Sequence, residues 1–301
     1  MTTFSVLICT YNRSDMLEKA LKALINRTDE KPDQVVVVNG GDDRTDLVVQ
    51  NYKSRSGLNV ELVKTVNKNL STSRNIGFAH CTGEIVAITD DDAEVFPTWV
   101  AQMKKAHAEH PEAGGVGGAV LGAESDKSLL SRIADVATFS SPPQSGYVRT
   151  IAGVNASYKR EVLQAVGPQD ETLFRGEDVD YNWRIKMLGY EIYYDPAIKV
   201  LHYHRPNLKQ FIYQFYMYGR AYYSVRRKWP EMYCVYPHGI HTSKDILRTV
   251  NILLRLFYLP IMHASKLPRQ IDRFSSLPIF FLAGLYWNLG VIHECWSSYG
   301  N

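Results

Sequence analysis

The chain has 301 residues, of which 45% are hydrophobic and 22% charged, a composition that excludes disordered and fibrous proteins. Its net charge of +3 is unevenly spread, because residues 206–301 carry eleven Lys or Arg against four Asp or Glu. The basic end and the acidic remainder are therefore expected to face different partners.

The four cysteines lie far apart and show no Cys-x-x-Cys spacing, so neither a zinc site nor a disulfide framework is expected. A reducing compartment is the default for such a chain. Residues 1–9 lead directly into an apolar run. They show neither a basic segment nor a long apolar leader, so no signal peptide is visible. We expect a cytoplasmic location.

Short apolar runs alternate with helical spacing over the first ninety residues. Strands are predicted at four places, namely 4–9, 34–38, 59–65 and 84–89. Helices are predicted between them, near 17–25, near 43–54, and from Ser71 as N-cap. This alternation predicts an α/β fold in which a parallel sheet carries helices on both faces.

Polar residues follow three of these predicted strands, at 10–13, 39–43 and 90–92. Ligands of such sheets bind at the carboxyl ends of the strands, so we expect the three loops to converge on one ligand. The chain has no Gly-x-Gly-x-x-Gly and no Gly-Lys-Ser/Thr motif, so neither a dinucleotide site nor a P-loop is supported.

Asp90, Asp91 and Asp92 are three successive carboxylates at a predicted strand end. Adjacent carboxylates repel one another and raise one another's pKa, a cost that a bound divalent cation would offset. Mg²⁺ and Mn²⁺ take oxygen ligands and keep substrate phosphates in their shell. The run therefore predicts a metal that holds a diphosphate, and a solvated acidic turn is the alternative.

The middle of the chain is less regular. Residues 114–122 are Gly-rich and apolar, and the stretch that follows to Val148, with Ser140–Gly146, has the composition of a mobile loop. A strand is predicted at 151–158 and a short helix at 159–166. A second helix at 176–189 begins with acids and ends in Gly, which suits the helix dipole.

After His204 the chain becomes aromatic and basic, with a predicted helix that ends near Trp229. Two apolar segments follow, at 246–263 and 277–292, and both look too short or too interrupted to span a bilayer. Interfacial or re-entrant helices at a membrane surface are expected, while a packed helical subdomain or a dimer contact stays open. Two domains are predicted, at 1–205 and 206–301.

Four motifs occur in order: Cys9-Thr-Tyr-Asn-Arg13, Arg74-Asn-Ile-Gly77, Thr89-Asp-Asp-Asp92 and Gly176-Glu-Asp-Val-Asp180. With this set the chain resembles the inverting GT-A glycosyltransferases of family 2, which include cellulose and hyaluronan synthases, over residues 4–204. The resemblance implies a GT-A fold, with a Rossmann-like mixed, mostly parallel sheet and a C-terminal helical extension. It also implies a nucleotide-diphosphate sugar donor and Mn²⁺ or Mg²⁺.

The resemblance further assigns roles to single residues. Asp92 is the direct metal ligand, and His202, preferred to His204, completes the metal shell. The donor-binding residues are Thr10, Tyr11, Asn12, Arg13, Asn39, Arg74, Asp90 and Asp91. Asn39 stands where many relatives place an Asp that reads uracil, which puts uridine specificity in doubt.

The catalytic residues implied by the resemblance are Asp178 as the base that removes the acceptor proton and Glu177 as its support. Asn155 is expected on the acceptor side, with an ordinary strand role as the alternative. The Gln-x-x-Arg-Trp motif of processive members does not occur, so addition of one sugar per encounter is expected.

The expected partners are a nucleotide-sugar donor, a glycan or lipid-linked acceptor of polysaccharide biosynthesis and the cytoplasmic face of the cell membrane. Nucleic acid is not expected, and oligomerisation is left open. A sugar-phosphate nucleotidyltransferase is one alternative, but its Gly-rich loop after the first strand does not occur, since residues 9–15 contain no glycine. An inactive membrane-bound scaffold is the other.

Overall fold

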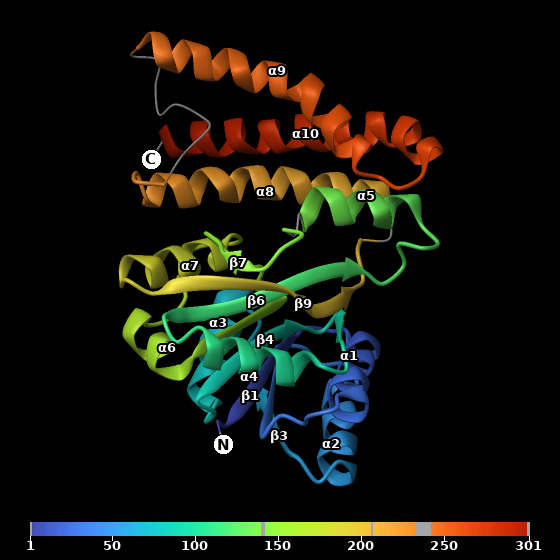
Figure 1. The fold of residues 1–301 in the computed structure, drawn as a ribbon, viewed down its shortest axis with the longest axis vertical. Helices are drawn as coiled ribbons and strands as arrows, with labels where there is room; N and C mark the ends of the chain where they lie inside the picture. Colours follow the sequence, from blue (N-terminus) through green and yellow to red (C-terminus); the bar gives the residue numbers. More distant parts are fainter. Residues whose placement is uncertain (1, 140–141, 206, 233–241, 300–301) are drawn as a thin grey trace. The chain divides into compact units, whose positions relative to one another are not determined.

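The computed structural model describes residues 2–139, 142–205, 207–232 and 242–299. The chain divides into two compact units, of which the first contains Met1–Leu121 with Ser141–Tyr203 and the second contains Gly122–Ser140 with His204–Asn301 (Figure 1). The segment before Ser140 belongs with the C-terminal helices although it lies far from them in the sequence.

The first unit is built on one mixed sheet with the strand order β3-β2-β1-β4-β8-β6-β9-β5, in which β7 pairs with β9. The strands are β1 (Phe4–Thr10), β2 (Gln34–Asn39), β3 (Asn59–Lys64), β4 (Ile85–Asp90), β5 (Ala93–Val95), β6 (Ala113–Gly122), β7 (Gly146–Tyr147), β8 (Asn155–Lys159) and β9 (Glu191–His202). The first four are parallel, and β8 pairs antiparallel with β4 and β6.

Helices cover both faces of this sheet. They are α1 (Ser14–Leu21) with the π-helical turn η1 (Lys22–Arg27), α2 (Thr45–Arg55), α3 (Leu70–His80), α4 (Trp99–Glu109), α6 (Arg160–Val166) and α7 (Glu177–Met187). Leu7 and Val36 join one buried cluster with side chains of α6 and α7, whereas Phe4 packs edge-on against Trp99 of α4. Because helices cover both faces of the sheet, the sequences of the parallel strands are continuously apolar. The predicted fold class is confirmed.

Local details differ from the sequence-based expectation. Helix α3 begins at Leu70 rather than after Ser71, because Asn69 is the N-cap and its side-chain oxygen accepts a 2.8 Å hydrogen bond from the Thr72 N–H. The Gly-rich run 113–122 is the strand β6. A Cβ on Gly118 would lie 2.0 Å from the Ile198 carbonyl oxygen, so the close approach of β9 requires glycine there.

The second unit is helical, with α5 (Leu129–Thr138), α8 (Leu208–Lys228), α9 (Ser243–Ser265) and α10 (Gln270–Tyr299). Helix α5 corrects the expectation of a mobile loop over this stretch. Its apolar residues Ile133 and Ala134 pack in one cluster with Phe211 of α8 and Phe280 of α10, and this packing stabilises the helix. Ser140 and Ser141, within the predicted loop, lie outside the described residues.

The two apolar helices are longer than expected. By length and composition, Ile246–Ser265 (20 residues) and Gln270–Ser297 (28 residues) are both sufficient to cross a membrane. The expectation that they were too short was wrong because both helices continue through an internal proline, Pro260 and Pro278. Only 11% of the most apolar part of Ile246–Ser265 is buried, and only 28% of the most apolar part of Gln270–Ser297. The core helix of a soluble protein is mostly buried.

Candidate active site

The loops after β1, β2 and β4 lie at one edge of the sheet. The parallel register places Cys9 of β1 opposite Asp90 of β4, and Thr10 opposite Asn39 of β2. The polar residues that follow each strand therefore meet, as predicted for the carboxyl ends of parallel strands.

Asp90, Asp92 and His202 form a cluster that can hold a metal ion. The antiparallel register of β5 and β9 places Ala93 opposite His202, so His202 lies beside Asp92, with Nε2 3.3 Å from the Asp92 Oδ1. One ligand atom from each of the three residues falls within 4.8 Å of the others. Two carboxylates and an imidazole fit Mn²⁺, and also Mg²⁺ that keeps water and phosphate oxygens as its other ligands.

Electrostatics distinguish the two carboxylates of this cluster. Burial raises the pKa of Asp90. Burial acts in the same direction on Asp92, but its hydrogen bond to His202 and the charges of His202 and Arg13 hold the pKa of Asp92 well below its usual range. Asp92 is therefore ionised at any physiological pH, as a metal ligand must be.

Arg13 pairs with two of the three aspartates. Its Nη1 lies 2.7 Å from the Asp91 Oδ1, and its Nη2 lies 2.8 Å from the Asp92 Oδ2. The Thr10 hydroxyl donates a 2.8 Å hydrogen bond to the other oxygen of Asp91. Burial raises the pKa of Asp91 to about 7, with Arg13 opposing the rise. Asp91 thus fixes the β1 loop against β4 and points its oxygens at protein groups.

Arg74 of α3 connects the acidic cluster to the start of α7. The side chain is 2% exposed, with Nη1 2.9 Å from the Glu177 Oε1 and Nη2 3.3 Å from the Asp90 Oδ1. A Cβ on Gly153 would lie 2.8 and 2.9 Å from the two terminal nitrogens of Arg74. Gly153 therefore leaves the room that the guanidinium occupies, a requirement that the sequence did not reveal because Gly153 lies in no recognised motif.

Asp178 lies in the first turn of α7, which begins after Gly176 in the left-handed conformation (φ +79°). Its Oδ2 accepts a 3.3 Å hydrogen bond from the Gly153 N–H, and its Oδ1 accepts a 2.8 Å bond from the Val179 N–H. Burial and the charge of Glu177 raise the pKa of Asp178 to about 6, against the lowering effect of Arg74. This carboxylate is ionised at neutral pH and still basic enough to accept a proton.

The β1 loop itself is held by Asn12. Asn12 is in the left-handed region (φ +51°), and its side-chain oxygen accepts a 3.0 Å hydrogen bond from the Asp42 N–H. A Cβ on Gly41 would lie 2.3 Å from that oxygen, so glycine is required. Tyr11, which is 50% exposed, remains accessible to a ligand.

Two predicted site residues have their amides engaged within the protein. Asn39, 1% exposed, donates to Asp46 and accepts from the Gly41 N–H. Asn155, fully buried, donates to the carbonyls of Ala119 and Ile198 and accepts from the Trp99 indole N–H. These bonds show that both side chains help to hold strands and loops together, while their expected roles at a nucleotide base and on the acceptor side stay predictions.

A mixed sheet with an acidic cluster at the carboxyl end of β4 and a carboxylate at the start of a late helix defines a GT-A type fold. The chain belongs to glycosyl transferase family 2, whose model matches residues 5–167. The family resemblance read from the four motifs is thereby confirmed.

Among similar proteins, a glucosyl-dolichyl phosphate glucuronosyltransferase of Haloferax volcanii is 28% identical over 182 residues, 58% of this chain and 58% of the relative. A probable glycosyltransferase of Bacillus subtilis, YdaM, is 28% identical over 205 residues, 64% of this chain and 49% of the relative. The matched region thus spans about half the length of these curated relatives.

Among solved structures, the mannosyltransferase PcManGT from Pyrobaculum calidifontis, in complex with GDP-Man and Mn²⁺, superposes with a TM-score of 0.64 at 20% identity. The likeness covers 96% of this chain and 87% of that one. At this identity the comparison establishes the fold.

Proposed function

We propose that this protein transfers a sugar from a nucleotide-diphosphate sugar to an acceptor hydroxyl, with a divalent metal and with inversion at the anomeric carbon. The observation that carries the proposal is the connection of two acidic groups through one buried arginine. Arg74 contacts Asp90 of the metal-type cluster and Glu177, the neighbour of Asp178. The proposed donor site and the residue beside the proposed base are thus joined by ion pairs to one arginine.

The donor diphosphate is proposed to bind at the β1 and β4 loops. Asp90, Asp92 and His202 would hold a Mn²⁺ or Mg²⁺, which neutralises phosphate charge and stabilises the leaving nucleotide. Arg13 holds Asp92 in place and keeps the aspartates from repelling one another. Tyr11 offers an exposed ring on which a base can stack.

Asp178 is proposed as the base. Inversion in one step requires a group that takes the acceptor proton as the hydroxyl attacks, and the raised pKa of Asp178 suits that role at neutral pH. The N–H groups of Gly153 and Val179 fix the orientation of the carboxylate. Glu177, paired with Arg74, supports the base by position and charge.

The acceptor is proposed to be a glycan or a lipid-linked glycan at the cytoplasmic face of a membrane, extended by one sugar per encounter. The exposed apolar helices α9 and α10 and the basic charge of residues 206–301 support a membrane surface as partner. The curated relative that acts on a glucosyl-dolichyl phosphate is consistent with a lipid-linked acceptor.

The test is thermal stabilisation by UDP, GDP, dTDP and CMP, each with and without Mn²⁺. A ligand at about 100 times its dissociation constant adds about 2.7 kcal/mol to the folded state, which a melting curve resolves. We expect one nucleotide to stabilise the protein only when Mn²⁺ is present, and we expect Asp92→Asn to abolish that shift. Asp29→Asn, at an exposed aspartate before β2 and away from the loops at the carboxyl ends of the strands, is the matched control.

Metal-independent stabilisation, or an Asp92→Asn protein that responds like the wild type, would contradict the assignment. The sugar nucleotides of the responding base are then tested for transfer to glycan and lipid-linked acceptors, with the anomeric configuration of the product read by NMR.

A further inference from the structure

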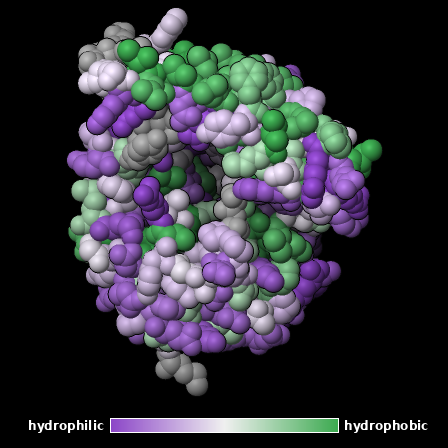
Figure 2. Space-filling view, turned by 45° about the horizontal axis from the view of Figure 1, so that its top comes forward, coloured by the Kyte–Doolittle hydropathy of each residue, from purple (hydrophilic) through white to green (hydrophobic). Residues whose placement is uncertain are grey.

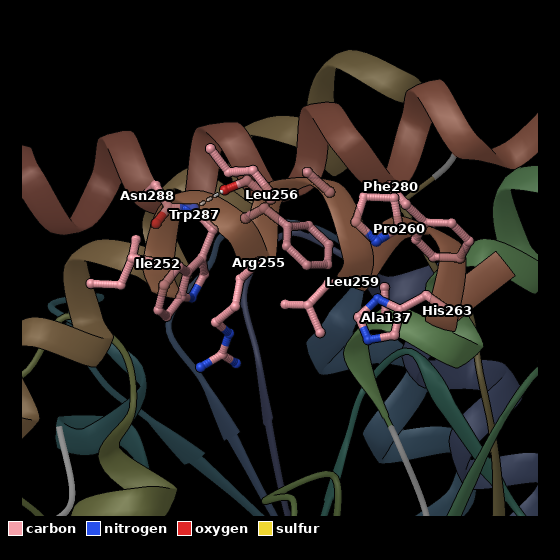
Figure 3. A pocket seen from close by; sticks show the side chains of 13 residues that line it. Ala137, Ile252, Arg255, Leu256, Leu259, Pro260, His263, Phe280, Trp287 and Asn288 are labelled. Atoms are coloured by element: carbon pink, nitrogen blue, oxygen red, sulfur yellow. Dashed lines mark hydrogen bonds between the residues drawn. The ribbon is translucent and has the colours of Figure 1, made fainter. Parts of the chain in front are cut away.

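The second unit contains a cavity that the proposed sugar transfer does not use (Figure 3). Its volume is about 170 Å³, and α9 and α10 supply most of its walls. The lining is largely aliphatic and aromatic, with Phe215, Leu256, Leu259, Phe280 and Trp287 among its residues. An apolar cavity of roughly 150 Å³ stays dry and takes a benzene-sized group, so this one suits a short length of hydrocarbon.

One cationic group lies at this cavity. Figure 3 shows the half-buried Arg255 extending its guanidinium away from the rings of Phe280 and Pro260. Within the residues that the structure describes, Arg255 forms no ion pair with an acid. A cavity with apolar walls and one cation matches a ligand that is a hydrocarbon chain at one end and an anion at the other.

The surface around the cavity is itself apolar. The exposed hydrophobic residues of α9 include Leu253, Leu254, Phe257 and Ile261, and Figure 2 shows hydrophobic side chains gathered over this helix. Lys266 and Arg269, just beyond the end of α9, add positive charge. An apolar face with adjacent basic residues fits the boundary between acyl chains and anionic headgroups of a bilayer.

We propose that this cavity binds one acyl chain of an anionic phospholipid, with the lipid phosphate paired to Arg255. The proposal rests on the membrane association proposed above and is independent of sugar transfer. A bilayer-facing helix pair with an open cavity would otherwise leave apolar walls without contacts, whereas a lipid chain fills them.

The test uses dioctanoyl-phosphatidylglycerol below its micellar concentration, so that no bilayer is present, and counts bound lipids on the intact protein by native mass spectrometry. Dioctanoyl-phosphatidylcholine is the neutral comparison. We expect saturation at one phosphatidylglycerol per chain, with weaker binding of phosphatidylcholine.

Gly284 provides the blocking variant. A Cβ there would meet only the Leu256 Cδ2, at 3.6 Å, so Gly284→Phe can place its ring in the cavity. We expect it to weaken phosphatidylglycerol binding about tenfold or more, since a buried chain loses its apolar contacts. Gly284→Leu is the second blocking variant if the larger side chain impairs folding, which a melting curve reports.

Arg255→Ala should weaken phosphatidylglycerol binding about three- to fivefold, as expected for a partly exposed ion pair. It should weaken phosphatidylcholine binding less, because the choline cation offsets the charge of that lipid's phosphate. Arg248→Ala, which removes the same charge from the same helix outside the cavity lining, should stay close to the wild type.

Unsaturable lipid uptake, wild-type binding by both Gly284 variants, or a concentration-dependent dimer that excludes lipid would overturn the proposal. Vesicle flotation of the same proteins distinguishes a failure of the cavity assignment from a failure of membrane association. If the Gly284 variants float and still bind the monomeric lipid, membrane association stands and the cavity assignment fails. If the wild type does not float, membrane association itself fails.

Discussion

At the scale of single residues, the site depends on how burial and neighbouring charges tune chemically identical carboxylates. Asp92 is held ionised by His202 and Arg13, whereas burial raises the pKa of Asp178 to about 6. One aspartate therefore suits a metal ligand and the other a base, although both follow another acidic residue in the sequence.

The proposed role of Asp178 as the base predicts how turnover depends on pH. Its pKa is raised, so the carboxylate becomes protonated as the pH falls through about 6 and can no longer accept the acceptor proton. We expect kcat to fall about tenfold per pH unit below that value. A pH profile of kcat with saturating donor measures this, and an acid limb near the ordinary pKa of aspartate would contradict the assignment.

Substitution of Asp178, the proposed base, separates binding from chemistry. Asp178→Asn keeps the size and hydrogen-bond geometry of the side chain and removes its basicity, so donor affinity should persist while kcat falls about 10²- to 10⁴-fold. Single-turnover transfer and nucleotide titration measure the two quantities. Glu161→Gln, at an exposed acid in the first turn of α6, is the control and should leave both unchanged.

At the scale of elements, the connection before β8 is as important as the motifs. Gly153 leaves space for the guanidinium of Arg74 and donates its N–H to Asp178. Gly153→Ala should lower the free energy of unfolding by about 1–3 kcal/mol and reduce kcat, because overpacking displaces buried groups.

Gly146→Ala is the matched control for this substitution. A Cβ at Gly146 meets nothing within 4 Å, so the free energy of unfolding should change by less than about 0.5 kcal/mol. Denaturant unfolding of both variants measures the difference. Equal stabilities would show that Arg74 is not confined as the structure indicates.

The helices α8 and α10 approach one another at glycines. A Cβ on Gly219 would lie 1.9 Å from the Trp287 carbonyl oxygen, and one on Gly290 would lie 2.0 Å from the Tyr216 carbonyl oxygen. These contacts are with backbone atoms, so Gly290→Ala must move a helix and should destabilise the protein by about 1–3 kcal/mol.

Gly284→Ala, on the same helix as Gly290, should instead stabilise the protein. Its Cβ finds an ordinary contact at 3.6 Å, and replacing glycine in a helix gains up to about 1 kcal/mol. Thermal unfolding of the two variants decides the point. A stable Gly290→Ala protein would contradict the close crossing.

At the scale of the whole molecule, the uneven charge and the exposed helices lead to one expectation about membranes. The wild type should float with phosphatidylcholine vesicles that contain phosphatidylglycerol, and salt should weaken the binding by screening the basic residues. Phe257→Asp on α9 should reduce binding roughly tenfold, since the ring, 66% exposed, would lose its lipid contact.

Leu47→Asp provides the control, because Leu47 is 72% exposed on α2 of the other unit. It should float like the wild type. Vesicle binding that responds equally to both substitutions would indicate general adhesion rather than a membrane surface at α9.

The sequence predicted those parts of the molecule that depend on local order. Alternating apolar runs and helical spacing placed β1 to β4 and the helices between them, because strand and helix periods are properties of neighbouring residues. The polar residues at strand ends followed from the rule for parallel sheets, so Thr10, Arg13 and Asp90–Asp92 were placed together correctly.

Tertiary structure decided what each polar group contacts. Arg74 and Glu177 lie 103 positions apart in the chain, and no local pattern indicates that they pair. The amides of Asn39 and Asn155 look available in the sequence but are used inside the protein. Helix α5 and the apolar cavity exist because distant helices cover one another's apolar faces, and such packing is a property of the folded chain alone.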